Sequence, residues 1–384
     1  MNKISPIFIL SLLFVLWSCS VESPLGMAEA ADSGAGEEGS GSGNNTQAGL
    51  ITAGEWNDLD NWDFWNGLMN GQDHSGKPGY WEVYLDNRIS VEIANNGSPV
   101  QDLQVELRQG SYVIWKTRTD NLGKAELWIN PYQAGGDISL GDYTLYVNGE
   151  PMGKDLKSYT EGVNRIEWST TGNPSNKVDL AFIVDATGSM GDELEFLKKD
   201  LEDVILSVQS EDQSKEIRTG TVFYRDQGDD YVTRKSDFTP DLSNTIGFIR
   251  EQQAGGGGDF PEAVHTALDR AVNELEWSQD ARTRIAFLLL DAPPHHNTQV
   301  LDDLQANIQK AAEKGIKVIP ITASGINKET EFLMRFMAIA TNGTYVFITN
   351  DSGIGNDHLE PTVGEYQVEF LNELMVRLIN KYSE

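Results

Sequence analysis

The chain has 384 residues, 59 of them acidic and 29 basic, which gives a formal net charge of −30 at pH 7. A surface this acidic repels nucleic acid and anionic lipid and attracts metal cations, so a nucleic-acid-binding role is excluded. The length is sufficient for two domains, each with a core of its own.

The N-terminus has the pattern of a secreted protein. Lys3 precedes an apolar run, residues 4–17, which is too short for a transmembrane helix and is typical of a signal peptide. The run ends just before Cys19, the only cysteine of the chain, with a leucine three positions upstream and a serine directly before it. This stretch resembles a bacterial lipoprotein processing site, which implies removal of residues 1–18 and acylation of Cys19. We therefore expect a lipid anchor in the bacterial cell envelope, at the outer membrane, facing the periplasm or the outside. The alternative is an ordinary secretory signal with an unrelated cysteine.

Two segments of unusual composition follow. Residues 19–50 are rich in Ser, Gly, Ala and Glu and are predicted to form a flexible acidic tether. Residues 51–79 are rich in tryptophan, with Trp56, Trp62 and Trp65 lying among acidic residues. These rings form either an exposed contact patch for a partner or glycan, or a cap on the edge of the following domain. We favour the cap.

Residues 80–170 alternate apolar and polar side chains in short runs separated by Asn, Gly and Pro. An alternation of period two is typical of strands, and several short strands predict a small all-β sandwich. Residues 97–125 resemble the transthyretin-like or carboxypeptidase-regulatory-like modules of extracellular proteins. The resemblance implies a spacer or accessory binding module without catalytic residues. Residues 171–176 contain Gly, Pro and Asn and are predicted to be an interdomain linker.

From residue 177 to residue 384, strand-like runs alternate with helical patterns. The predicted strands cover residues 178–184, 219–224, 285–290, 317–321 and 344–348, and the predicted helices cover residues 194–208, 242–252, 261–275, 299–314, 329–340 and 366–382. This alternation predicts an α/β fold, a doubly wound, mostly parallel, Rossmann-like sheet with helices on both faces. Ligands of such sheets bind at the carboxyl ends of the strands.

Oxygen-bearing side chains gather at that predicted edge. Asp185, Thr187 and Ser189 follow the first strand of this part, Asp259 follows four glycines, and Asp291 follows a later strand. Carboxylates and hydroxyls are hard ligands, which favours one divalent cation, Mg²⁺ first and Ca²⁺ or Mn²⁺ as alternatives. The other interpretation makes the aspartates helix N-caps and the hydroxyls turn residues.

The Asp-x-Thr-x-Ser motif, the Gly-Gly-Gly-Asp-x-Pro-Glu loop and the later aspartate together resemble a von Willebrand factor A domain with its metal-ion-dependent adhesion site. The resemblance covers residues 177–384. It implies that Thr187 and Ser189 bind the metal through their hydroxyls and that Asp185 and Asp291 bind it directly or through water. It also implies one coordination position left open for an acidic side chain of a partner.

One position departs from the usual pattern of that family, because Asp259 stands where many such domains supply a threonine. An added carboxylate makes the site more anionic. We therefore predict tighter metal binding, a shift of metal preference towards Ca²⁺, and a weaker preference for acidic partners.

Residues of neighbouring loops are candidates for a rim that contacts the partner. Arg225 and Asp226 begin a predicted hairpin turn, and His295 and His296 follow the later strand end. Residues 350–355 form another loop at the same predicted edge. Solvated turns and ordinary surface histidines are the favoured alternative for all of them.

No catalytic set is evident. The glycines at 255–258 are not followed by the Lys-Ser/Thr of a phosphate-binding loop. A metal-assisted hydrolase would need a general base, for which Glu262 and His295 are candidates. We therefore predict a non-enzymatic, metal-dependent protein-binding module for adhesion or scaffolding, which captures a protein partner and contacts the membrane only through Cys19. The alternatives are a metal-assisted hydrolase and a structural envelope protein whose metal only stabilises the fold.

Overall fold

A computed structural model describes residues 47–71, 74–153, 155–169 and 175–384. The predicted signal peptide, Cys19, most of the predicted tether and residues 171–174 of the predicted linker lie outside the described residues. Within the described ranges, no helix combines the length and the apolar character needed to cross a membrane.

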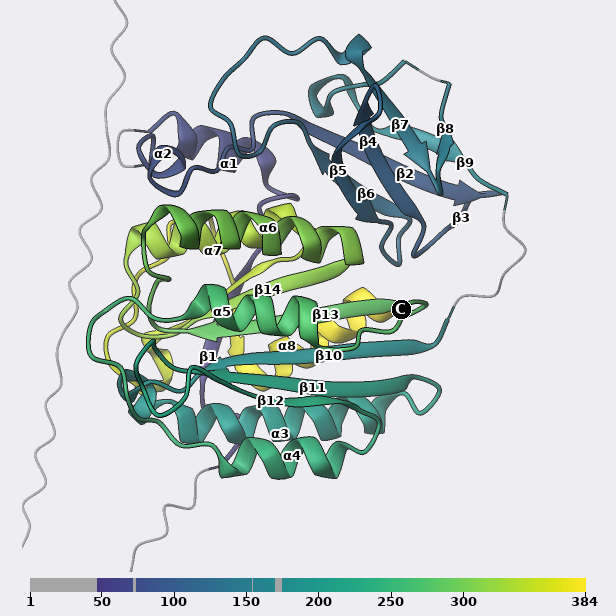
Figure 1. Ribbon diagram of the computed structural model, residues 1–384. Helices are drawn as coiled ribbons and strands as arrows, with labels where there is room; N and C mark the ends of the chain where they lie inside the picture. Colours follow the sequence, from purple (N-terminus) through teal and green to yellow (C-terminus); the bar gives the residue numbers. More distant parts are fainter. Residues whose placement is uncertain (1–46, 72–73, 154, 170–174) are drawn as a thin grey trace, which may run out of the picture. The chain divides into compact units, whose positions relative to one another are not determined.

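The larger part of the described chain is built around an eight-stranded sheet in the order β12-β11-β10-β13-β14-β15-β1-β16 (Figure 1). The parallel strands are β10 (Lys177–Asp185), β11 (Glu216–Tyr224), β13 (Thr283–Leu290), β14 (Ile316–Thr322) and β15 (Tyr345–Ile348). Two strands run against these five, β12 (Thr233–Thr239) and β1 (Thr52–Trp56), and the edge strand β16 (Val368–Phe370) pairs antiparallel with β1. Every residue of β13 is buried, as expected for a parallel strand covered on both faces.

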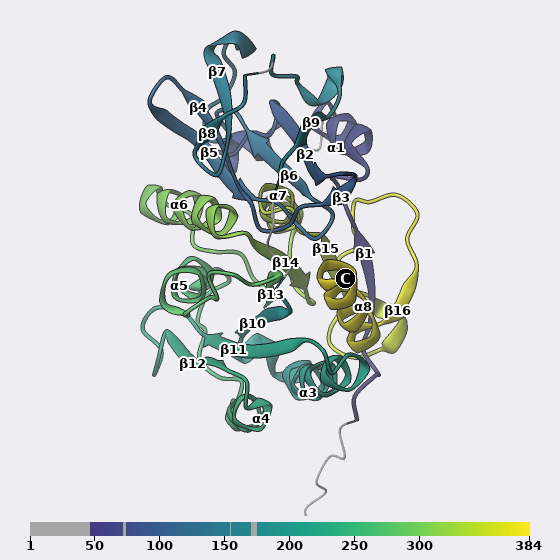
Figure 2. The same ribbon diagram turned by 90° about the vertical axis from the view of Figure 1, so that its right-hand side faces the viewer.

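Helices cover both faces of this sheet (Figure 1 and Figure 2). One face carries α3 (Leu194–Glu211), α4 (Leu242–Glu251) and α8 (Leu371–Ser383), and the other carries α5 (Val264–Asp269), α6 (Thr298–Lys314) and α7 (Lys328–Ala340). Asn297 and Asn327 cap α6 and α7, because their side chains accept hydrogen bonds from the backbone N–H groups of Val300 and Thr330. Short 3-10 helices cover Leu140–Asp142, Tyr159–Glu161, Gly188–Asp192 and Asn350–Ser352. The layers confirm the predicted doubly wound α/β fold.

Two predicted helices begin later than their sequence patterns indicated. The first begins at Val264, because Glu262 is held in an extended bridge to the loop after β13, and its last turn, Arg270–Glu274, is π-helical. The second begins at Leu371, because the residues before it form β16 and pair with β1. Both differences come from pairing with distant segments, which local periodicity does not report.

The tryptophan-rich segment does not stand apart from the α/β part. Its strand β1 lies between β15 and β16, with Ala53 opposite Ile348 on one side and Glu369 on the other. The domain boundaries predicted from sequence, which start the α/β part at residue 177, therefore omit one strand of its sheet. A five-residue strand that pairs so far along the chain has no local signature.

Helices α1 (Trp62–Met69) and α2 (Lys77–Trp81) follow β1, and the three tryptophans named above are buried. The Trp65 ring stacks on Phe332 of α7 at 5.5 Å, and the Trp62 ring lies 5.6 Å from Trp128 in the next region. The rings therefore pack between the two folded parts and do not form an exposed contact patch.

The region that follows contains two mostly antiparallel sheets. One holds β3 (Ser98–Pro99), β2 (Arg88–Asn95), β6 (Lys124–Trp128) and β9 (Asn164–Glu167), and the other holds β5 (Tyr112–Arg118), β4 (Gln104–Gln109), β7 (Tyr143–Val147) and β8 (Glu150–Pro151). Their buried side chains share one apolar core with α5, α6 and α7. The likeness of this region to transthyretin-like modules stays a prediction.

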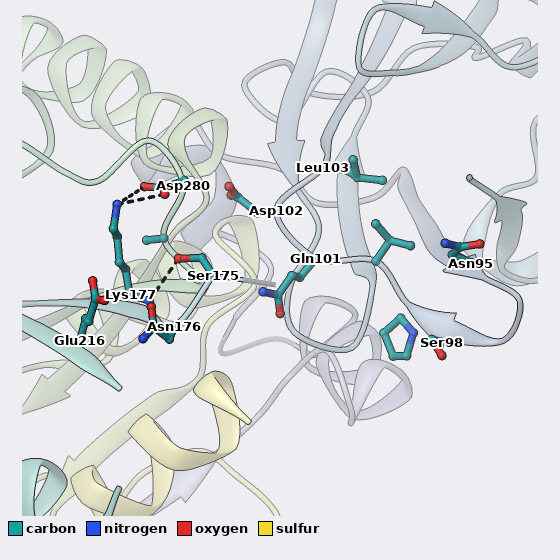
Figure 3. A pocket seen from close by; sticks show the side chains of 13 residues that line it. Asn95, Ser98, Gln101, Asp102, Leu103, Ser175, Asn176, Lys177, Glu216 and Asp280 are labelled. Carbon is teal, nitrogen blue, oxygen red and sulfur yellow. Dashed lines mark hydrogen bonds and ion pairs between the residues drawn. The ribbon is translucent and has the colours of Figure 1, made fainter. Parts of the chain in front are cut away.

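The β region meets the α/β part close to the amino ends of β10 and β13. A hollow of about 650 Å³ lies there, lined by the loop around Asp102 and by residues near Lys177 (Figure 3). Lys177 Nζ lies 2.9 Å from Asp280 Oδ1, and Asp102 Oδ1 accepts a 2.8 Å hydrogen bond from Arg284 of β13. The Arg284–Asp102 pair joins the two parts, whereas the Lys177–Asp280 pair lies within the α/β part. This end of the sheet is opposite to the predicted metal site.

Candidate metal centre

Asp185 and Asp291 occupy the carboxyl ends of adjacent parallel strands. Asp185 is the last residue of β10, and Asp291 directly follows β13, the strand beside it. Their relative exposures are 0% and 4%. Because adjacent parallel strands end at the same edge, the sheet brings both carboxylates into one buried site, as the sequence predicts.

The loop after β10 adds two hydroxyls. The Asp185 Oδ1 atom accepts hydrogen bonds from Thr187 N at 2.8 Å and from Thr187 Oγ1 at 2.7 Å, and the Thr187 and Ser189 hydroxyl oxygens lie 3.2 Å apart. Thr187 is fully buried, whereas Ser189 is exposed. The hydroxyl of Thr187 therefore lies in the buried part of the loop, and that of Ser189 lies where the loop meets solvent.

The two carboxylates are unfavourably placed as bare charges. Burial, and next the charge of Asp291, raise the pKa of Asp185 to about 7. Burial also raises the pKa of Asp291 to about 6, and Glu193 adds to this shift while the Ser189 hydroxyl opposes it. Asp185 Oδ2 and Asp291 Oδ1 have no hydrogen-bond partner among the described residues. The nearby Tyr224 hydroxyl is not in good hydrogen-bond geometry to fill that role.

The structure adds Glu262 to this site. Its exposure is 3%, and its Oε2 atom also lacks a partner among the described residues. A Cβ atom on Gly257 would lie 3.0 Å from Glu262 Oε1 and 3.4 Å from Thr187 Cβ, so the glutamate side chain reaches the Asp185 loop. Burial, and next the charge of Asp185, raise the pKa of Glu262 to about 9. Sequence analysis named Glu262 only as a candidate base, although its place three residues after Asp259 was the available signal.

Asp259 is placed differently from the expectation. Its side chain is exposed, and the charges that contribute most to the pKa shifts of Asp185, Asp291 and Glu262 come from other residues. The backbone explains this, because Glu262 donates its N–H to Pro293 O at 2.8 Å and is thereby drawn to the Asp291 loop. The buried carboxylate that this loop supplies is Glu262, and a role for Asp259 as a ligand stays a prediction.

The rim residues divide into two groups. Arg225 donates from Nε to Ala186 O at 3.1 Å, and His295 Nε2 lies 2.7 Å from Asp226 Oδ1, so these three side chains surround the site. His296 instead turns to α2, where its ring stacks on Tyr80 at 3.9 Å. His296 therefore has a packing partner within the chain.

The glycine run packs against the same hairpin. Gly256 has φ of 74°, and a Cβ atom there would overlap the Asp229 carboxylate, which accepts a 2.8 Å hydrogen bond from Gly257 N. The glycines therefore serve close backbone packing, in agreement with the exclusion of a phosphate-binding loop.

The donor set fits a hard divalent cation. In the described ranges, no three His, Cys, Asp or Glu side chains converge tightly enough to hold an ion by themselves. The hydroxyls of Thr187 and Ser189 would therefore have to complete the ligand set of Asp185, Asp291 and Glu262. An all-oxygen set with three carboxylates suits Mg²⁺, Mn²⁺ or Ca²⁺, and a bound cation would neutralise the unpartnered carboxylate oxygens.

Comparison with known proteins agrees with this fold. Residues 179–357 match the family model of the von Willebrand factor type A domain. The chain therefore carries a domain of this family, as its motifs predicted, and such domains generally act as protein-interaction modules.

Two curated proteins are similar to parts of the chain. A putative ariadne-like RING finger protein of Acanthamoeba polyphaga mimivirus is 34% identical over 131 residues, which are 34% of this chain and 12% of that protein. The alpha-protein kinase vwkA of Dictyostelium discoideum is 34% identical over 124 residues, which are 32% of this chain and 19% of that protein. The chain thus spans less than a fifth of the length of either relative.

Two Bacteroides proteins of known structure align with about half of this chain. An aerotolerance-related membrane protein of Bacteroides fragilis is 14% identical, with a TM-score of 0.35 over 53% of this chain and 99% of that chain. The conserved hypothetical protein BatB of Bacteroides thetaiotaomicron is 15% identical, with a TM-score of 0.37 over 54% and 98%. Likeness of this degree carries no argument about function.

Proposed function

We propose that the chain is a metal-dependent protein-capture module displayed on a lipid anchor in the bacterial cell envelope. One observation carries the metal dependence: Asp185, Asp291 and Glu262 are buried together, and each has a carboxylate oxygen without a partner among the described residues. Buried carboxylates of like charge are costly unless a cation or a proton neutralises them. The adjacent hydroxyls of Thr187 and Ser189 favour the cation.

The residues divide the work of binding. Asp185 and Asp291 would supply the buried negative charge that attracts the cation. The hydrogen bonds from Thr187 to Asp185 Oδ1 fix the loop that carries Ser189. A divalent cation held there would supply a positive, exchangeable coordination position to an acidic side chain of a partner. Arg225 and His295 stand at the rim, where they would select among partners.

Three carboxylates around one cation would reduce the attraction between that cation and a fourth carboxylate, supplied by a partner. The sequence assigned this effect to Asp259, and we assign it to Glu262, because Glu262 is the buried acidic group of that loop. We therefore expect modest affinity for a single partner carboxylate, supplemented by contacts at the rim. The raised pKa of Glu262 follows from burial and its acidic neighbours, so it gives no separate support for a hydrolase.

The anchoring part of the proposal rests on Cys19 and the apolar run before it. Metabolic labelling of a bacterial host with a fatty-acid analogue should tag the full chain. The Cys19→Ser variant should stay unlabelled and leave the membrane fraction. Labelling that persists in this variant overturns the anchor.

Capture is tested with the full chain immobilised and incubated with envelope extract, with Mg²⁺ or with EDTA. We expect a discrete partner to be retained only with the cation, and to be lost in Asp185→Ala. Asp259→Asn, which changes an exposed carboxylate of the neighbouring loop, is the matched control and should retain the partner. Equal retention with EDTA, in a chain that stays folded by circular dichroism, overturns the capture proposal. Loss of folding in EDTA would instead assign the cation a structural role, and turnover of a test ester or phosphoester would assign a hydrolase.

A further inference from the structure

A second group of oxygen ligands lies between α3 and α8, away from the carboxyl ends of the strands. Asp200 and Asp203 are three residues apart on α3 and therefore share one helix face, and Asn372 lies in the first turn of α8. Asn372 Nδ2 donates to Asp203 Oδ2 at 2.8 Å, which joins the two helices.

The segment that leads into β1 closes this group. Gly49 N donates to Asp200 Oδ1 at 2.7 Å, and a Cβ atom on Gly49 would lie 3.7 Å from Asn372 Oδ1. The φ of Gly49 is 72°, a conformation that side-chain-bearing residues rarely adopt. The backbone therefore turns directly over the two side chains.

Two oxygens of this group are buried without a partner. Asp200 is 2% exposed and Asn372 is 9% exposed, and neither Asp200 Oδ2 nor Asn372 Oδ1 has a hydrogen-bond partner among the described residues. Asn372 cannot relieve this by exchanging its oxygen and nitrogen, because its oxygen would then face the Asp203 carboxylate. Buried polar atoms in such a position are costly unless a further group binds them.

The charges around the group are negative. Burial, and also the Asp203 carboxylate, raise the pKa of Asp200 to about 7, while the Gly49 N–H opposes the shift. A hollow of about 720 Å³ reaches Asp203 and Asn372 and is also lined by Glu211, Glu373 and Glu384. Its basic residues, Arg377 and Lys381, are engaged with Glu55. A cation therefore has an acidic route to the group.

We propose that Asp200, Asp203 and Asn372 form a second divalent-cation site, which ties the segment before β1 to α3 and α8. Two carboxylates and an amide carbonyl, with water from the hollow, are the ligands typical of Ca²⁺, which accepts six to eight oxygens in flexible geometry. The ion would neutralise the Asp200 carboxylate and give Asn372 Oδ1 the partner that it lacks among the described residues. It would also fix the segment that leads from the N-terminal residues into the folded part. The site is independent of the proposed capture function.

Calorimetric titration of the metal-free full chain with CaCl₂ tests the proposal. We expect two Ca²⁺ ions per chain in the wild type, one in Asp185→Ala, one in the double variant Asp200→Asn/Asp203→Asn, and none when these changes are combined. Glu211→Gln, which lines the hollow outside the group, is the matched control and should bind two. If the double variant binds the same number of ions as the wild type with an unchanged Kd, the second site is refuted. If Asp185→Ala alone abolishes all binding, the second site is refuted and the strand-end site stands.

A second measurement gives a local readout. Ca²⁺ should slow amide hydrogen exchange at residues 47–51 in the wild type and in Asp185→Ala, but not in Asp200→Asn/Asp203→Asn. Asn372→Asp adds a carboxylate and should tighten Ca²⁺ binding about tenfold, since affinity rises with ligand charge. Unchanged affinity in a folded Asn372→Asp variant also overturns the proposal. If exchange slows at low pH without Ca²⁺ and does not respond to Ca²⁺, a proton and not a cation neutralises the group.

Discussion

Asp58 and Arg335 form a two-bond ion pair that is almost completely withdrawn from solvent. Arg335 donates from Nε to Asp58 Oδ2 at 2.8 Å and from Nη2 to Asp58 Oδ1 at 2.6 Å, and the two side chains are 1% and 2% exposed. Asp58 belongs to the tryptophan-rich segment and Arg335 to α7. The pair therefore fixes that segment on the helix layer of the α/β part.

Breaking this pair should be costly, because it removes the nearer of the two carboxylates that face the buried Arg335 guanidinium; the other, on Glu331, lies 3.6 Å away. We expect Asp58→Asn to lower the free energy of unfolding by about 3–5 kcal/mol. The matched change Glu55→Gln, which weakens the half-exposed pair with Arg377, should cost no more than about 1 kcal/mol. Chemical denaturation of both variants measures the difference, and equal costs would show that the buried pair does not anchor the segment.

Without a bound cation, stability should fall as the pH rises. Folding raises the pKa of Asp185 from 3.8 to about 7, that of Asp291 from 3.8 to about 6, and that of Glu262 from 4.5 to about 9. For each group, the folded chain binds more protons than the unfolded chain at pH values between its ordinary and its raised pKa. Their contribution is therefore fully present below about pH 4 and is lost progressively by about pH 9.

Thermal unfolding in EDTA from pH 5 to pH 9 measures this dependence. Asp185→Asn should show a shallower fall than the wild type, which separates the site from the general repulsion of an acidic chain. Saturating Mg²⁺ or Ca²⁺ should reverse the trend above pH 7, since the cation binds the deprotonated groups. A wild type and variant with parallel pH profiles would contradict the assignment.

The contribution of the glycine-rich loop is tested at two positions. Glu262→Gln removes a buried carboxylate, so it should weaken cation binding on the order of tenfold and raise the metal-free unfolding temperature. Asp259→Asn changes an exposed carboxylate of the same loop and should alter the cation Kd less than twofold. The reverse result, with Asp259→Asn the more damaging change, would restore Asp259 as the ligand that the sequence indicated.

The sequence predicted the layers and the shared place of Asp185 and Asp291 at one sheet edge, because both depend on local patterns. Apolar runs such as β13 are visible in a few residues, and the two aspartates are placed by the strands that they end. The place of Glu262 depends instead on a backbone bridge to the loop after β13, and the place of β1 on pairing with β15 and β16. Such long-range pairing leaves no periodic signal, which is why the sequence analysis named Glu262 only as a candidate base and began the α/β part after β1.

The position of β1 predicts that the α/β part needs the segment before residue 80. A fragment of residues 177–384 lacks β1, so the edge of β15 loses its antiparallel partner and β16 loses its only neighbour in the described sheet. It also uncovers Phe332 and leaves Arg335 without Asp58. An uncovered strand edge and apolar face favour association between molecules.

We expect this fragment to self-associate in size-exclusion chromatography and to unfold at least about 10 °C below the whole chain. A chain that lacks only residues 1–46 keeps β1 and should keep the oligomeric state and the unfolding midpoint of the whole chain. A 177–384 fragment that matches the whole chain in both would show that β1 is dispensable.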